Sequence, residues 1–251
     1  MDAGCIPFSV RVAGFLFITS GHRLNPQWTA VASKRRTYQR IAWLYDLLDL
    51  PFEYGRYRPL RRRVFRGVGG TVLDAGVGTG RNMPFYPRSA SVTGLDLSPA
   101  MLARAERRRA RLGVQAELRV ASVLRTGLPD RHFDFVVATF LFCVLDDADQ
   151  RPALEELARI CKPGGEIRIL EYAWARRPLR RAVMRLWKPW ARWAYGAAFD
   201  RDTEQYLSAA GLELTECVPL HEDIIKLIVA RVPEAAKLPV PLAEDSWENM
   251  P

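Results

Sequence analysis

The residues with the clearest chemical meaning are a glycine-rich loop and two acids that follow apolar strands. The loop reads Asp74-Ala75-Gly76-Val77-Gly78-Thr79-Gly80 and continues directly from the apolar run Thr71-Val72-Leu73. Glycines at alternate positions let the backbone turn tightly against a ligand. The second acid, Asp96, lies sixteen residues past Gly80 and is placed to bind the two hydroxyls of a ribose. A helix expected from about Asn82 would add unpaired N–H groups, so the pattern predicts a nucleoside-containing ligand.

Cysteine and histidine spacing argues against a metal centre. None of the four cysteines pairs with another at the spacing of metal ligands, and the three histidines are far apart. Cys143 and Cys161 lie in apolar patterns, which predicts buried free thiols. We therefore expect no metal ion.

The elements that must position the loop and the acids form an α/β pattern. Strands are expected over 71–77, 91–97, 115–123, 133–140 and 166–173, with helices over 100–112 and 149–161. Two helices within 38–65, separated at Pro51, precede them. This alternation predicts a parallel sheet covered on both faces by helices. Strands over 212–220 and 223–232 are joined by a short turn at His221, which requires an antiparallel hairpin.

An insertion of about 174–209 separates the fifth strand from the hairpin. It holds four tryptophans and seven basic residues within a stretch that contains no acid. We therefore divide the chain into an extension (1–37), one domain with a helical N-terminal cap and a helical lid (38–232), and a proline-containing tail (233–251).

The size and the charge of the chain limit the functions that it could have. The chain has 251 residues, 49% of them apolar, and a formal net charge of +9, which favours nucleic acid or an anionic membrane as a partner. No apolar run reaches the ~20 residues of a membrane span. The apolar stretch 5–20 lacks the basic start and cleavage pattern of a signal peptide, so we expect a cytoplasmic protein.

Five short stretches occur in a fixed order, and their spacing is more specific than any one of them. They are Tyr38-Gln39-Arg40-Ile41-Ala42 with Tyr45-Asp46; Val72 to Gly80; Val92 to Ser98 with Met101-Leu102; Leu128-Pro129-Asp130 before Phe133-Asp134; and Leu157-Ala158-Arg159 leading into Lys162-Pro163-Gly164-Gly165. Together they resemble class I S-adenosylmethionine-dependent methyltransferases. The chain is most similar to the branch of ubiquinone/menaquinone C-methyltransferases and bacterial phospholipid N-methyltransferases.

The resemblance implies a Rossmann-like sheet of seven mostly parallel strands with an antiparallel last strand, and S-adenosylmethionine as cofactor. It implies that the glycine loop packs against the methionine part and the ribose, and that Asp96 binds the ribose hydroxyls. Ser122-Val123 stands where the family has an acid that meets the adenine, which is a departure. The implied cofactor-binding residues are Asp74, Gly76, Gly78, Thr79, Gly80, Asp96, Leu97, Met101, Ser122, Val123, Thr139 and Phe140. The competing cofactor, NAD, is disfavoured because its fingerprint is Gly-x-Gly-x-x-Gly rather than Gly-x-Gly-x-Gly.

Methyl transfer needs alignment, a dry pocket and, for some acceptors, removal of a proton. Candidate catalytic residues are Tyr45 on the capping helix, Glu171 (with Tyr172 beside it) at the end of the fifth strand, and His221 in the terminal turn. Each has a structural alternative: Tyr45 as a core aromatic, Glu171 as a surface acid, and His221 as a turn residue.

The insertion predicts an amphipathic helix that Pro189 must kink or split. One face would carry Leu179, Val183, Leu186, Trp190 and Trp193, and the opposite face Arg181, Arg185, Lys188 and Arg192. This composition is typical of a helix at a membrane interface. The alternative is a lid that packs its apolar face on its own domain. Nucleic acid is disfavoured because the sequence contains no RNA-binding module.

We expect a methyltransferase acting near the inner membrane face on an amphiphilic acceptor. The leading acceptor is a phospholipid amine of the phosphatidylethanolamine type. The alternatives are ring C-methylation of a quinone precursor, methylation of a small thiol or amine, and, outside enzymes, a cofactor-binding regulator or membrane adaptor.

Overall fold

The computed structural model describes residues 53–195, 198, 201–221 and 223–234. The extension 1–37, the first predicted helix of the cap with Tyr45, and the tail from 235 onward lie outside the described residues.

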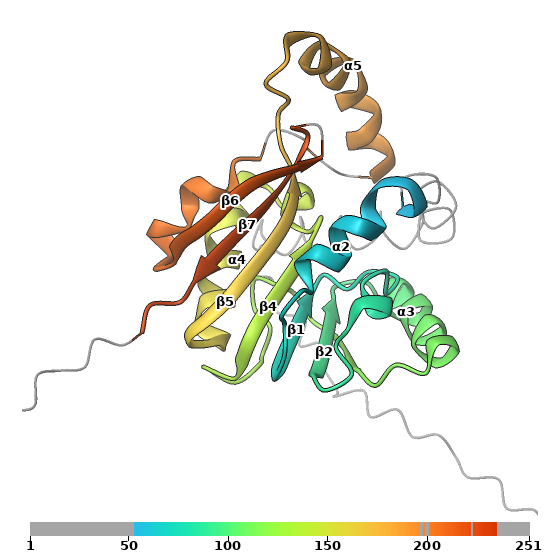
Figure 1. Ribbon diagram of the computed structural model, residues 1–251, viewed down its shortest axis with the longest axis vertical. Coiled ribbons are helices and arrows are strands. Elements are labelled where there is room, and N and C mark those ends of the chain that lie inside the picture. Colours follow the sequence, from blue (N-terminus) through green and yellow to red (C-terminus); the bar gives the residue numbers. More distant parts are fainter. Residues whose placement is uncertain (1–52, 196–197, 199–200, 222, 235–251) are drawn as a thin grey trace, which may run out of the picture.

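Seven strands form one sheet in the order β3-β2-β1-β4-β5-β7-β6 (Figure 1). Neighbouring strands from β3 to β5 pair in parallel, whereas β7 is antiparallel to both β5 and β6. This topology confirms the predicted fold, with β7 as the antiparallel strand. It also brings the carboxyl ends of β1, β4, β5 and β6 to the same edge of the sheet. The strands are β1 Thr71–Ala75, β2 Ser91–Asp96, β3 Glu117–Val120, β4 Phe133–Thr139, β5 Cys161–Tyr172, β6 Glu213–His221 and β7 Ile225–Arg231.

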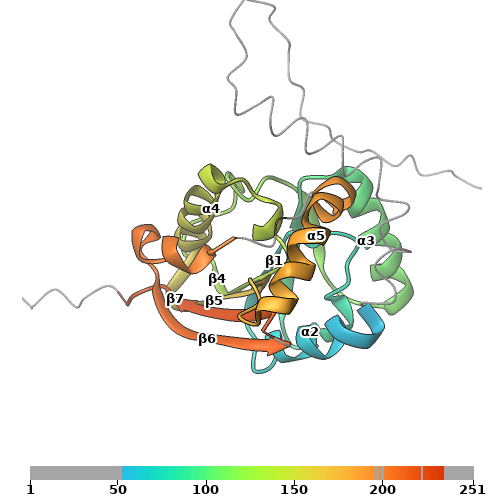
Figure 2. The same ribbon diagram turned by 90° about the horizontal axis from the view of Figure 1, so that it is seen from above.

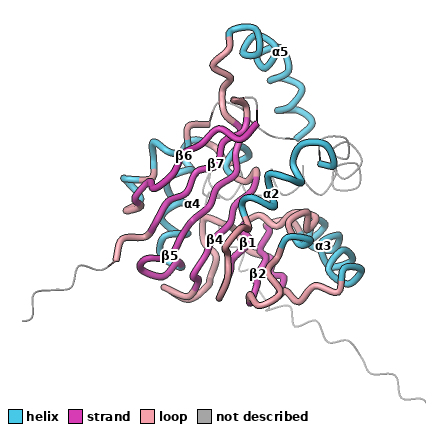
Figure 3. Tube along the Cα trace, in the orientation of Figure 1, coloured by secondary structure: helices cyan, strands magenta, loops and turns pink. Residues whose placement is uncertain are grey.

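Helices cover both faces of the sheet (Figures 2 and 3). They are α2 Arg58–Val64, preceded by a π-helical turn at Glu53–Tyr57; α3 Pro99–Leu112; α4 Asp147–Ile160; and α5 Pro178–Tyr195. The helix α3 begins at Ser98, whose hydroxyl accepts the Met101 N–H, and ends at Gly113 in the left-handed conformation. The helix α5 stands beyond the carboxyl ends of the strands (Figures 1 and 2).

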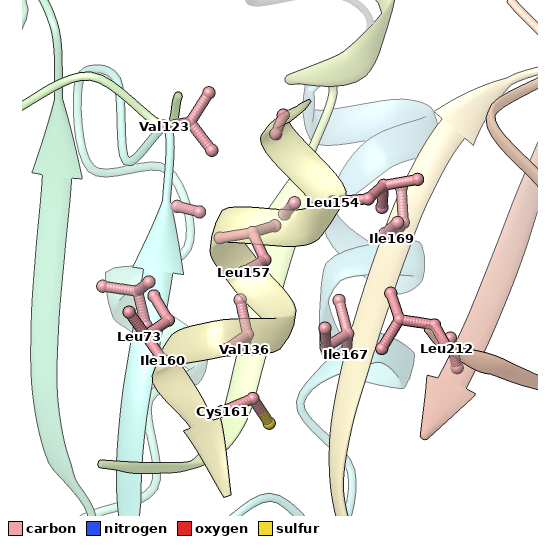
Figure 4. Close-up of a cluster of buried hydrophobic side chains, with 14 of the residues drawn as sticks. Leu73, Val123, Val136, Leu154, Leu157, Ile160, Cys161, Ile167, Ile169 and Leu212 are labelled. Atoms are coloured by element: carbon pink, nitrogen blue, oxygen red, sulfur yellow. The ribbon is translucent and has the colours of Figure 1, made fainter. Parts of the chain in front are cut away.

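The two larger apolar clusters of the core lie on opposite faces of the sheet. One joins α4 to Leu73, Val136 and Ile167 (Figure 4). The other joins α2 to Val72 and Val137. Because successive strand residues point to opposite faces, the packing of these two faces also fixes which face each side chain at the carboxyl ends of the strands points to.

Several predicted boundaries were wrong. No α-helix begins near Asn82; a 3-10 turn at Met83–Phe85 takes its place, because Tyr86 precedes Pro87 and is held extended, with ψ at 131°. The helix α4 does end before the segment 162–165, at Ile160, but that segment belongs to β5, which was predicted to begin only at 166. Gly165 fits there because a Cβ atom at this position would lie 2.9 Å from the Asp134 carbonyl oxygen.

Three further expectations differ from the structure. The strand predicted over 115–123 shortens to β3, because the chain turns at Ser122, where the Arg125 N–H binds the Ser122 carbonyl. His221 is not in a turn but ends β6, paired with Ile225 of β7. The helix α5 continues through Pro189 rather than splitting. Proline has no N–H group to donate to the carbonyl group of Arg185, four residues earlier in the helix. Because Pro189 is exposed, water can bind that carbonyl group instead.

Candidate active site

The glycine loop follows β1 and adopts the conformation that its sequence predicted. Gly76, Gly78 and Gly80 all have positive φ, at 72°, 55° and 81°. A Cβ atom at Gly76 would lie 2.9 Å from Leu141 Cδ1, and one at Gly80 would lie 2.8 Å from Met83 Sδ, whereas one at Gly78 would have only the Gly76 carbonyl oxygen near it, at 3.9 Å. Neighbouring side chains therefore crowd the first and third glycine positions, while Gly78 leaves open space beside the backbone.

Asp96 at the end of β2 is bound to this loop. Its carboxylate accepts the Gly78 N–H at 3.0 Å and the Ser98 N–H at 2.8 Å. Burial raises the pKa of Asp96, and the two N–H groups oppose that rise. The structure thus brings together two features that the sequence separates by eighteen positions.

The remaining predicted cofactor residues surround Asp96 and the loop. Ala121, directly before Ser122, donates its N–H to the Asp96 carbonyl, so Ser122 lies close to the end of β2. Ser122 and Leu97 are half-buried, whereas Val123 and Met101 pack into the interior. Thr79 is buried and accepts a hydrogen bond from the Arg108 guanidinium at 3.3 Å.

Asp74 belongs to a buried polar network on the face covered by α2. Its carboxylate accepts Asn82 Nδ2 at 2.8 Å and the Tyr86 hydroxyl at 2.5 Å. Arg61 of α2 donates to Asn82 Oδ1 at 2.8 Å and to Thr139 Oγ1 at 2.9 Å. Burial raises the pKa of Asp74 to about 6, although the hydrogen bonds from Tyr86 and Asn82 and the charge of Arg61 lower it.

Phe140 follows β4 with a φ of 54°, an uncommon value for a residue with a side chain. Its ring centroid lies 4.9 Å from those of Tyr57 and Tyr172, and the Arg61 guanidinium carbon lies 5.5 Å away. The Tyr57 and Tyr172 hydroxyl groups are 2.9 Å apart and form a hydrogen bond. We call Tyr57, Phe140 and Tyr172 the aromatic cluster. Backbone strain of this kind concentrates at functional sites.

The three predicted catalytic residues are not brought together among the described residues. Tyr45 lies outside them. Glu171 is fully buried and points to the α4 face, opposite to the aromatic cluster; its carboxylate accepts the N–H groups of Cys143 and Tyr172, both at 2.8 Å. Burial raises the pKa of Glu171 to about 7. His221 ends β6, and its buried Nε2 atom has no hydrogen-bond partner in the structure.

Sequence reasoning missed the roles of Arg61, Asn82, Tyr86 and Tyr57. Their one sequence signal was proximity to known motifs: Asn82 and Tyr86 follow the glycine loop within six residues. Nothing in the chain's pattern distinguished Arg61 from the arginines beside it. As predicted, Cys143 and Cys161 are buried free thiols. The described part of the chain contains no group of three side chains suited to hold a metal ion.

The helix α5 exposes its apolar face. Leu179, Val183, Leu186 and Trp187 are 78%, 50%, 80% and 53% exposed. Asp223, in the β6–β7 turn, holds the start of this segment by accepting the N–H groups of Arg176 and Arg177 at 2.7 and 3.3 Å and the Arg180 guanidinium at 3.1 Å. Within the described ranges, no helix is long and apolar enough to cross a bilayer.

Comparison with known proteins matches residues 72–165 to a family model described as a methyltransferase domain. A phosphatidylethanolamine N-methyltransferase of Cereibacter sphaeroides is 38% identical over 143 residues, which are 55% of this chain and 66% of that protein. A demethylmenaquinone methyltransferase of Tropheryma whipplei is 32% identical over 154 residues, covering 58% and 62% of the two chains. The matched segment thus spans less than two thirds of these relatives.

A solved structure extends the similarity to the fold. Geranyl diphosphate C-methyltransferase of Streptomyces coelicolor, in complex with Mg²⁺, geranyl diphosphate and S-adenosyl-L-homocysteine, superposes with a TM-score of 0.56 at 16% identity. The superposition covers 70% of this chain and 81% of that one.

Proposed function

We propose that this protein, whose chain carries a class I S-adenosylmethionine-dependent methyltransferase domain, methylates the amine of an amphiphilic acceptor, a phospholipid of the phosphatidylethanolamine type. The observation that carries the lipid assignment is the exposed apolar face of α5 beyond the carboxyl edge of the sheet. The name of the Cereibacter relative supports the same substrate class.

The site fits the proposed cofactor, which supplies an electrophilic methyl group when bound. Gly78 leaves room beside the backbone, as close approach of a ligand requires. The half-buried Asp96 carboxylate is suited to accept hydrogen bonds from ribose hydroxyls, and Ser122 next to it can accept or donate one at the adenine. We propose these roles together with the packing of the loop against the methionine part.

The aromatic cluster is proposed as the acceptor side. An amine attacks only in its neutral form, so the site must hold the nitrogen with its lone pair directed at the methyl group and must exclude water. The Tyr57 and Tyr172 hydroxyls can accept hydrogen bonds from the amine N–H groups. The aromatic rings stabilise the methylated ammonium product through cation–π attraction. The roles predicted for Tyr45, Glu171 and His221 remain predictions.

We propose that α5 lies on an anionic membrane surface and binds it. Its exposed leucines would enter the interface, and its exposed basic residues, Arg181 and Arg185 among them, would contact anionic headgroups at about 1 kcal/mol each. The protein would then act as a peripheral enzyme at the inner membrane face.

A second candidate is C-methylation of a quinone precursor, favoured by the name of the Tropheryma relative. The discriminating experiment is transfer of label from radioactive S-adenosylmethionine into a total bacterial lipid extract. Label in amine phospholipids supports the proposal, and label in the quinone fraction supports the second candidate. Cofactor binding without lipid label would redirect the search to small water-soluble acceptors or to a regulator.

The membrane proposal has its own test in flotation with anionic liposomes. Leu179→Gln combined with Leu186→Gln should release the protein from the liposomes and leave its affinity for S-adenosylhomocysteine unchanged. The two substitutions should leave the fold intact, because both leucines are about four-fifths exposed. Retained flotation would contradict the membrane role of α5.

A further inference from the structure

The segment that follows β4, residues 140–143, touches both the aromatic cluster and the glycine loop. Phe140 belongs to the cluster, and its φ of 54° is uncommon for a residue with a side chain. Leu141 packs against the loop, since a Cβ atom at Gly76 would lie 2.9 Å from its Cδ1 atom. The position of this segment therefore affects how a methyl donor on the loop and an acceptor at the cluster are aligned, and transfer is sensitive to that alignment.

Three successive residues at the end of β5 hold this segment. The Phe140 N–H donates to the Leu170 carbonyl at 2.8 Å. The Cys143 N–H donates to the Glu171 carboxylate, also at 2.8 Å. The Tyr172 ring packs on Phe140 with the ring centroids 4.9 Å apart. Glu171 points away from the aromatic cluster, but its hydrogen bond to Cys143 connects it to the same short segment.

Cys143 connects Glu171 to Phe140 and to the insertion that contains α5. The Cys143 thiol donates to the Phe140 carbonyl at 3.3 Å. The Cys143 carbonyl accepts the N–H of Ala198, which follows α5 in the chain, at 2.8 Å. A strained backbone conformation persists only where its surroundings fix it. The bonds to Leu170 and Cys143 fix Phe140 on both sides, and Glu171 in turn fixes Cys143.

Stability of the fold alone does not explain an acid at position 171. Glu171 is fully buried, and it forms no ion pair with any residue that the structure describes. Lys226 lies opposite it on β7, but the Lys226 ammonium group binds the Glu204 carboxylate at 2.6 Å. Burial is unfavourable for the charged form, and it raises the pKa of Glu171 to about 7. Ionisable groups held in such surroundings are typical of functional sites.

We infer that Glu171 is a positioning residue for methyl transfer: its carboxylate fixes Cys143, which holds Phe140 at the acceptor site and the insertion at Ala198. This inference rests on the proposed function, because the aromatic cluster is the proposed acceptor site. It differs from the predicted catalytic role of Glu171, since here the carboxylate acts through Cys143 and does not touch the acceptor.

The first test compares two acid-to-amide substitutions in methyl transfer to phosphatidylethanolamine in mixed micelles, at a temperature where each variant is folded. Glu171→Gln leaves one main-chain N–H without an acceptor. It should lower kcat about 10-fold or more and keep the KM for S-adenosylmethionine within about twofold. Glu156→Gln is the matched control, because the Glu156 carboxylate also accepts a main-chain N–H, from Thr126 at 2.7 Å in the loop leading into β4. It should keep the wild-type kcat.

A second pair of variants tests the same connection from the side of Cys143, and it decides the question if Glu171→Gln does not fold. Cys143→Ala removes the donor to the Phe140 carbonyl and should lower kcat about 2- to 10-fold, as expected for one hydrogen bond. Cys143→Ser keeps a donor of similar size and should restore most of the wild-type kcat.

Hydrogen exchange adds a measurement that needs no acceptor. The amide groups of 140–143 and Ala198 should exchange about 10-fold faster in Glu171→Gln than in Glu156→Gln, because their restraint is weakened. Equal exchange in the two variants would overturn the inference for any acceptor. A wild-type kcat in Glu171→Gln or Cys143→Ala, or an equal loss in Glu156→Gln, would overturn it too. Failure of the wild-type protein to methylate phosphatidylethanolamine would instead refute the proposed function.

Discussion

Replacing Glu171 with glutamine is expected to remove a large pH dependence from the free energy of unfolding. Glu171 is fully buried, and main-chain N–H groups of Cys143 and Tyr172 bind its carboxylate. Burial nevertheless dominates and raises its pKa from 4.5 to about 7. The folded protein therefore holds the Glu171 proton in a pH range where the unfolded chain has released it.

The sign and size of the effect follow from this difference. Because the folded-state pKa is the higher one, the stabilisation is fully present below pH 4.5 and is lost as the pH rises through about 7. At about 1.4 kcal/mol for each pKa unit, the full loss is on the order of 3 kcal/mol. Between about pH 5 and pH 8.5, roughly 2 to 3 kcal/mol of it should be observable. Asp74, with its pKa raised to about 6, adds a separate loss of the same sign.

Urea unfolding at these two pH values measures how much stability the wild-type protein and Glu171→Gln each lose between them, and the two losses are then compared. Glu171→Gln should lose less stability than the wild-type protein on going to the higher pH, by about 2 kcal/mol. It should be less stable at the lower pH, because an amide cannot accept from both N–H groups, at a cost of about 1–3 kcal/mol. The exposed Glu213→Gln is the control and should keep the wild-type difference. If Glu171→Gln and wild type lost equal stability, Glu171 would not titrate as a buried acid and the reasoning would fail.

Three further substitutions probe the site and its support. Asp96→Ala should weaken binding of S-adenosylhomocysteine by about 100-fold or more, because two charge-assisted hydrogen bonds are lost; calorimetry showing wild-type affinity would remove Asp96 from the ribose site. Gly76→Ala should cost about 1–3 kcal/mol in urea unfolding, because φ is 72° and the new Cβ would lie 2.9 Å from Leu141; a variant of unchanged stability would show that the loop can relax. Asp134→Asn should cost about 1 kcal/mol at neutral pH, discounted for exposure. The Lys162 hydrogen bond lowers the pKa of Asp134 to about 2, so this stabilisation is present above pH 3.8 and disappears as the pH falls through 2; an equal cost near pH 2 would contradict it.

The fold was predictable because its signals are local. Apolar runs ending in turn residues located all seven strands, and a turn too short for a crossover required the antiparallel pairing of β6 with β7. The failures arose where a long-range contact or a proline overrode a local pattern. Pro87 prevented the helix near Asn82, and β5 begins at Cys161 rather than at the predicted residue 166, where Gly165 lies close to the Asp134 carbonyl group.

Part of the site was predictable for the same reason. The glycine loop and Asp96 each carry a distinctive residue type at a distinctive spacing, and the structure joins them through the Gly78 N–H. The network around Asp74 was not predictable, because its members come from distant positions. Arg61 and Thr139 are 78 residues apart, and the hydroxyl pair of the aromatic cluster joins residues 115 positions apart.

The sequence by itself determined the α/β architecture, the glycine loop, the ribose acid and the amphipathic character of α5, because each depends on the type and spacing of neighbouring residues. The tertiary structure alone decided which face each side chain serves. Alternation along β5 places Glu171 and Tyr172 on opposite faces, but only the packing of α2 and α4 decides which of the two meets Phe140. Likewise, the pattern of α5 predicted an apolar face, and only the fold showed Leu179 and Leu186 to be exposed.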